Sequence, residues 1–121
     1  MADKAIVGCM QSDLRAVVDA LMAHLQWEEP YPISIAGGAA VPEAVAEISR
    51  SLNTFQRKGG KAVLLTGHEE CAAGGTFSYL MDNAKEIQAR FQHLTVIAFW
   101  FHRVEPGQRG FDGWTFRRVP L

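Results

Sequence analysis

The fold of this chain is decided by a stretch that passes from apolar into polar residues, Val63-Leu64-Leu65-Thr66-Gly67-His68-Glu69-Glu70-Cys71. Its first half is aliphatic and β-branched, which predicts a buried strand over residues 62–66 that runs into a loop carrying His68. A continuous apolar strand is typical of a parallel sheet covered on both faces. The loop then offers an imidazole and a thiol three residues apart, and both groups are metal ligands.

Two kinds of segment alternate on either side of this stretch. Short apolar runs predict strands, and apolar residues at helical spacing predict helices between them. The further expected strands are residues 5–8, 33–35, 94–101 and 114–119, and the expected helices span residues 14–25, 41–55 and 77–91. Ser12 is expected to cap the first helix, and Gly59 and Gly60 to end the second.

This order of elements predicts an α/β domain in three layers. We expect a mostly parallel sheet with strand order 2-1-3-4, followed by a C-terminal edge strand and flanked by helices. Residues 114–119 are assigned to the edge because aromatic and basic residues alternate there. The 121 residues are the length of one domain, which we place at residues 1–121.

Composition narrows the classes of function. Apolar residues make up 48% of the chain and charged ones 21%, which is typical of a soluble globular protein. The net charge is −1 with both signs mixed along the chain, so neither a nucleic acid nor a membrane is an expected partner. No secretory pattern is found at residues 1–4, and a cytoplasmic protein is expected. In that reducing compartment the two cysteines are predicted to be thiols or metal ligands rather than a disulfide.

Three of these side chains are expected to converge. Cys9 follows the first strand, and His68 and Cys71 follow the third. With strand order 2-1-3-4 these strands are neighbours, and groups at the carboxyl ends of neighbouring parallel strands face one crevice. Two thiolates and an imidazole suit Zn²⁺, and three protein ligands leave one tetrahedral position open for water. The competing interpretation of Cys9 alone is a small buried hydrophobe.

The order and spacing of several motifs resemble the β-class carbonic anhydrases in a shortened form. The matching residues are Cys9 to Ser12 with Asp13 and Arg15, then Ala36-Gly37-Gly38, then Gly67, His68 and Cys71. The resemblance implies a carbonic-anhydrase-like domain that holds zinc through Cys9, His68 and Cys71. It also implies hydration of carbon dioxide to bicarbonate by hydroxide formed on the zinc, and assembly as a homodimer or higher homo-oligomer. Gly37 and Gly38 would lie beside the site as substrate-binding residues.

The family's first motif, Cys-x-Asp-x-Arg, fits this chain in two ways. Without a gap, Gln11 and Asp13 occupy the Asp and Arg positions; with a two-residue insertion, Asp13 and Arg15 restore the pair. In the second alignment Asp13 and Arg15 would be catalytic, with Arg15 holding Asp13 while Asp13 orients the hydroxide. In the first, Gln11 would bind the water or substrate but could not ionise. Asp13 could also simply place negative charge at a helix N-terminus.

These alternatives lead to different functions. The main hypothesis is zinc-dependent hydration of carbon dioxide, in which the metal lowers the pKa of its bound water from about 16 to about 7. The alternatives are a non-catalytic metal- or anion-binding protein that lacks the Asp-Arg pair, and a zinc hydrolase acting on another small heterocumulene. Glu69 and Glu70 are either proton relays or surface charges.

Overall fold

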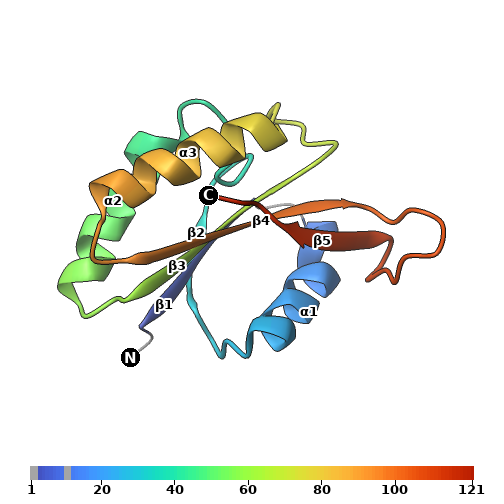
Figure 1. Ribbon diagram of the computed structural model, residues 1–121, viewed down its shortest axis with the longest axis horizontal. Helices are drawn as coiled ribbons and strands as arrows, with labels where there is room; N and C mark the ends of the chain where they lie inside the picture. Colours follow the sequence, from blue (N-terminus) through green and yellow to red (C-terminus); the bar gives the residue numbers. More distant parts are fainter. Residues whose placement is uncertain (1–2, 10–11) are drawn as a thin grey trace.

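The structure is a computed structural model that describes residues 3–9 and 12–121. Its centre is one five-stranded sheet with strand order β2-β1-β3-β4-β5 (Figure 1). The strands are β1 (Lys4–Gly8), β2 (Tyr31–Ser34), β3 (Ala62–His68), β4 (Thr95–Arg103) and β5 (Trp114–Arg118). The first four are parallel, and β5 runs antiparallel to β4 at the edge. The predicted fold class and strand order are therefore confirmed.

Helices cover both faces of the sheet and complete the three layers (Figure 1). Helix α1 (Arg15–Leu25) lies on one face, whereas α2 (Ala44–Arg57) and α3 (Phe77–Arg90) lie on the other. Alternate residues of each strand point to opposite faces, so the apolar core is divided into two clusters. Val63 and Leu65 belong to the cluster beneath α2 and α3, and Leu64 belongs to the cluster beneath α1.

The direction in which strands are added reverses between β1 and β3. Helix α1 connects β1 to β2 on one side of β1, and α2 then carries the chain across to β3 on the other side. Right-handed crossovers in opposite directions put α1 and α2 on opposite faces. The carboxyl ends of β1 and β3 therefore flank a topological switch point, where open α/β sheets bind their ligands.

Two local predictions need correction. Strand β3 continues to His68, which pairs with Phe101, because the longer strand β4 extends the ladder by two residues. His68 is therefore the last residue of a strand rather than part of the loop. The residues Ser12–Leu14 form a 3₁₀ turn, and the N-cap of α1 is Leu14, which makes no side-chain capping bond. Ser12 is thus not the cap of this helix.

The predicted end of α2 is confirmed in detail. Gly59 adopts a positive φ of 91°, its N–H donates to the carbonyl of Gln56, and the N–H of Gly60 donates to that of Phe55. This is the Schellman arrangement that glycine permits. In the described part of the chain, no helix has the length and apolar character needed to cross a lipid bilayer.

Candidate metal centre

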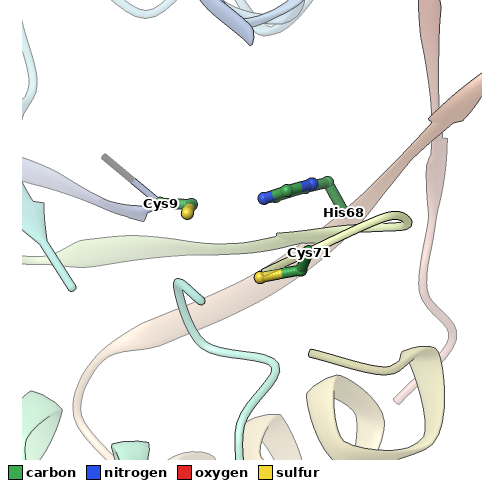
Figure 2. Close-up of side chains that lie close together, drawn as sticks. All are labelled: Cys9, His68 and Cys71. Atoms are coloured by element: carbon green, nitrogen blue, oxygen red, sulfur yellow. The ribbon is translucent and has the colours of Figure 1, made fainter. Parts of the chain in front are cut away.

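The carboxyl ends of β1 and β3 bring Cys9, His68 and Cys71 together. Cys9 directly follows β1, His68 ends β3, and Cys71 comes three residues later. One ligand atom from each, the two sulfurs and an imidazole nitrogen, lie within 4.8 Å of one another. Figure 2 shows that Cys9 comes from one segment and that His68 and Cys71 come from another, with the ring of His68 extending toward Cys9. Both cysteines are free thiols and half-buried.

His68 presents one nitrogen to this cluster without a partner. The side chain is only 1% exposed, and its Nδ1 lies 2.8 Å from the backbone carbonyl oxygen of Glu69. A carbonyl oxygen only accepts, so Nδ1 carries the proton and donates it. In the neutral ring Nε2 then holds a lone pair, and among the described residues this buried atom finds no hydrogen-bond partner.

The donor set fits a zinc ion. A tetrahedral ion with Zn–S distances of about 2.3 Å and a Zn–N distance of about 2.0 Å holds its ligand atoms about 3.5–3.8 Å apart. The observed limit of 4.8 Å is close to that span. Coordination would also relieve the unsatisfied Nε2, because a buried polar atom without a partner costs about 1–3 kcal/mol. A ligating histidine typically donates its other ring N–H to a carbonyl or carboxylate, as Nδ1 does here.

Gly37 and Gly38 lie beside the cluster, where a close approach of backbones requires them. Both have positive φ, 84° and 61°. A Cβ at Gly38 would stand 2.6 Å from the carbonyl oxygen of Thr66 and 3.3 Å from the backbone nitrogen of Cys9. A Cβ at Gly37 would stand 3.2 Å from the Cβ of Ala73. These glycines therefore let their turn pack against the chain around two of the three candidate ligands, and their predicted contact with substrate stays a prediction.

Two buried polar side chains that the sequence analysis did not single out hold this region in place. The side-chain amide of Asn83, on α3, donates to the carbonyls of Ala39 (2.9 Å) and Val41 (2.7 Å), just after the glycine turn. Thr66 donates its hydroxyl to the carbonyl of Val7 at 2.7 Å and so links β3 to β1 two residues before Cys9. The sequence could have indicated Asn83, since it is a polar residue within the otherwise apolar face of α3.

The other predicted site residues do not converge in the same way. Gln11 lies outside the described residues. Asp13 and Arg15 are both exposed, one in the 3₁₀ turn and the other at the start of α1. The ion pairs found among residues 3–9 and 12–121 join other partners and do not include this pair.

Glu69 and Glu70 are engaged by a residue of the neighbouring strand. The carboxylate of Glu69 accepts from the backbone N–H of Arg103 at 2.6 Å, and that of Glu70 accepts from Arg103 Nε at 2.8 Å. The Glu70–Arg103 contact is also an ion pair. Both carboxylates therefore fasten the segment between His68 and Cys71 to the end of β4.

The fold and the Cys-His-Cys cluster together define an α/β protein with a possible metal site at its switch point. Among solved structures, the chain has the fold of a carbonic anhydrase from Streptococcus mutans. That likeness has a TM-score of 0.58 and 18% sequence identity, and it covers 98% of this chain and 82% of the other. No family model matches the chain, and a search of curated proteins finds no match either.

Proposed function

We propose that this protein is a zinc enzyme that hydrates carbon dioxide to bicarbonate. The observation that carries the proposal is the meeting of two thiols and the unpartnered Nε2 of His68 at the switch point of this sheet. The fold shared with a carbonic anhydrase supports it. Zinc bound there would supply Lewis-acid activation of a water molecule at neutral pH.

The chain's own residues prepare the site for that ion. The bond from Nδ1 of His68 to the Glu69 carbonyl fixes the tautomer and leaves the lone pair of Nε2 free for the ion. Cys9 and Cys71 would hold the ion as thiolates, so its binding would release their protons. Three protein ligands would leave room for solvent at the ion, and we assign the orientation of that solvent to Asp13, which is exposed and, among the described residues, makes no ion pair with Arg15.

Stopped-flow measurement of carbon dioxide hydration, on protein shown to hold one zinc per chain, tests the proposal. We expect a rate above the buffer background that disappears in Cys71→Ser, because a serine hydroxyl is a poor zinc ligand at neutral pH. A background rate in fully loaded wild-type protein would reject the proposal.

The role of Asp13 needs a matched pair of variants. Asp13→Asn should lower kcat/KM by about 100-fold, the scale of a positioned proton-transfer group. Asp19→Asn is the control, because Asp19 is also exposed and lies on α1. Equal rates in the two variants would remove Asp13 from the catalytic machinery.

A non-catalytic metal-binding protein is the second candidate. The exposed, unconnected positions of Asp13 and Arg15 favour it, because an Asp that orients solvent needs a partner to hold it. Stoichiometric zinc without hydration activity would select this candidate.

A further inference from the structure

One residue outside the metal-ligand set bonds to both of the residues that separate two of the ligands in the sequence. Arg103 ends β4, and its side chain is 46% exposed. Its backbone N–H binds the Glu69 carboxylate, and its Nε binds the Glu70 carboxylate. Glu69 and Glu70 are the only residues between His68 and Cys71 in the sequence, so Arg103 holds both of the links between these two ligands.

The same guanidinium reaches His68 by a second route. Its central carbon lies 4.0 Å from the centroid of the Trp114 ring, a distance typical of cation–π stacking. Trp114 is fully buried and stands perpendicular to the imidazole of His68, with ring centroids 5.7 Å apart and an interplanar angle of 89°. Trp114 therefore limits the tilt of the imidazole, and the guanidinium of Arg103 stacks on Trp114.

The backbone of Glu69 and Glu70 is also held in place. The N–H of Glu69 donates to the carbonyl of Phe101 at 3.1 Å, and the carbonyl of Glu69 accepts from His68 Nδ1. Glu70 has a positive φ of 57°, a conformation that a non-glycine residue adopts only when its surroundings hold it there. The ion pair with Arg103 is one such restraint on Glu70.

We propose that Arg103 is a positioning residue for the metal centre: its side chain, through Glu70 and Trp114, holds His68 and Cys71 in the geometry that binds the ion, while its backbone N–H adds a bond to Glu69 that side-chain variants keep. This inference rests on the proposed zinc site and goes beyond it by assigning metal affinity to a residue that contacts no ligand atom. Arginine suits the task because its planar fork can bind a carboxylate and stack on an aromatic ring together, which a lysine ammonium cannot reproduce.

The test compares metal affinity among Arg103→Ala, Arg103→Lys and a matched control. Arg109→Ala is the control, since Arg109 is exposed, lies on the β4–β5 connection that follows Arg103 and stacks on Phe111 instead. The Zn²⁺ dissociation constant is measured by competition with a chromophoric chelator. We expect R103A to raise it about 10- to 100-fold, the usual loss when a group that supports a metal ligand is removed, R103K to raise it less, and R109A to leave it unchanged.

Two further readouts separate positioning from a general loss of stability. The Co²⁺-substituted R103A protein should show altered visible absorption, while the urea midpoint of its metal-free form stays near that of R109A. Glu70→Gln, which keeps the fold of the loop but weakens the ion pair, should raise the Zn²⁺ dissociation constant in the same direction. Unchanged affinity in R103A and E70Q, or an affinity loss matched by a lower metal-free midpoint, would overturn the inference.

The outcome also separates this inference from the proposed function. Wild-type protein that binds zinc but does not hydrate carbon dioxide, with weakened binding in R103A, would support the role of Arg103 and reject the enzyme. Wild-type protein that hydrates carbon dioxide, with unchanged zinc affinity in R103A, would support the enzyme and reject the role of Arg103.

Discussion

At the scale of single residues, polar groups in apolar surroundings give the site its shape. His68, Thr66 and Asn83 are the buried polar residues among those that the structure describes. Thr66 and Asn83 are satisfied by backbone carbonyls, whereas His68 keeps one nitrogen free. Buried polar atoms are nearly always paired. Among the described residues Ser49 Oγ, Trp114 Nε1 and His68 Nε2 lack a partner, and of these three residues only His68 is clustered with two thiols, so its free nitrogen indicates a ligand.

Asn83 gives a pH-dependent prediction. Asn83→Ala removes two buried hydrogen bonds and should cost about 1–3 kcal/mol of stability at any pH. Asn83→Asp places a carboxyl against two carbonyl oxygens; a protonated acid can donate to one of them and a carboxylate to neither, so the pKa of the introduced group rises in the folded state above its unfolded value of about 3.9. Its stability should therefore match wild type best below pH 4 and fall as the pH rises. Urea unfolding at several pH values measures this, and a pH-independent difference would contradict it.

Gly38 gives a prediction that separates backbone strain from steric contact. Gly38→Ala should destabilise the protein by more than the roughly 1–2 kcal/mol of a left-handed alanine, because its Cβ would press on two backbone atoms. Gly107→Ala is the control: its φ is also positive, 86°, and a Cβ there would meet nothing within 4 Å. Thermal unfolding measures both variants. Equal losses of stability in Gly38→Ala and Gly107→Ala would show that the contact of the added Cβ with Thr66 and Cys9 has no effect.

Sequence patterns predicted the three candidate ligands but not the residues that support them. Cys9, His68 and Cys71 are recognisable because thiols and imidazoles at strand ends carry a chemical type and a topological position. Arg103 and Trp114 are not recognisable from the sequence, because their contacts depend on the register of β5 against β4. That register pairs Arg103 directly with Trp114. The hairpin connection between them, exposed and irregular, does not reveal that register.

At the scale of elements, helix α3 follows the Cys71 loop and anchors its far end. The backbone N–H of Thr76 donates to the carbonyl of Ala40, and its side-chain oxygen caps the helix by accepting from the N–H of Tyr79 at 3.1 Å. The cap therefore joins the helix, the ligand loop and the glycine turn at one residue.

This cap predicts a matched pair of results. Thr76→Ala should lower the free energy of unfolding by about 0.5–2 kcal/mol, the usual cost of losing an N-cap. Thr76→Ser keeps a hydroxyl that can cap the helix, so its free energy of unfolding should stay close to that of the wild type. Chemical denaturation followed by circular dichroism measures both. Equal stability of the two variants would mean that the capping bond contributes nothing.

Elements were predicted well where periodicity alone determines them. The apolar runs of β1, β3 and β4 and the stripes of α2 and α3 were recognised, and the expected order of the strands is confirmed, although alternation alone does not determine it. Boundaries were missed where tertiary pairing decides them. Strand β3 reaches His68 because β4 is long, and α1 begins only after a 3₁₀ turn.

At the scale of the whole molecule, the candidate ligands join the two halves of the sheet. Cys9 directly follows β1, while His68 and Cys71 lie on the other side of the switch point. An ion bound by all three stabilises the native state by mass action and closes a long loop of chain. We expect zinc at 100 times its dissociation constant to add about 2.7 kcal/mol of stability, and a chelator to remove it. A melting temperature that changes neither with added zinc nor with a chelator would contradict this coupling between metal binding and folding.

The central claim is that one ion is held by Cys9, His68 and Cys71. X-ray absorption spectroscopy of zinc-loaded protein, with metal content measured on the same sample, tests it most directly. The account predicts one zinc per chain with two sulfur atoms at about 2.3 Å and one imidazole nitrogen at about 2.0 Å. A spectrum without a sulfur shell, or a protein that binds no zinc, would contradict it.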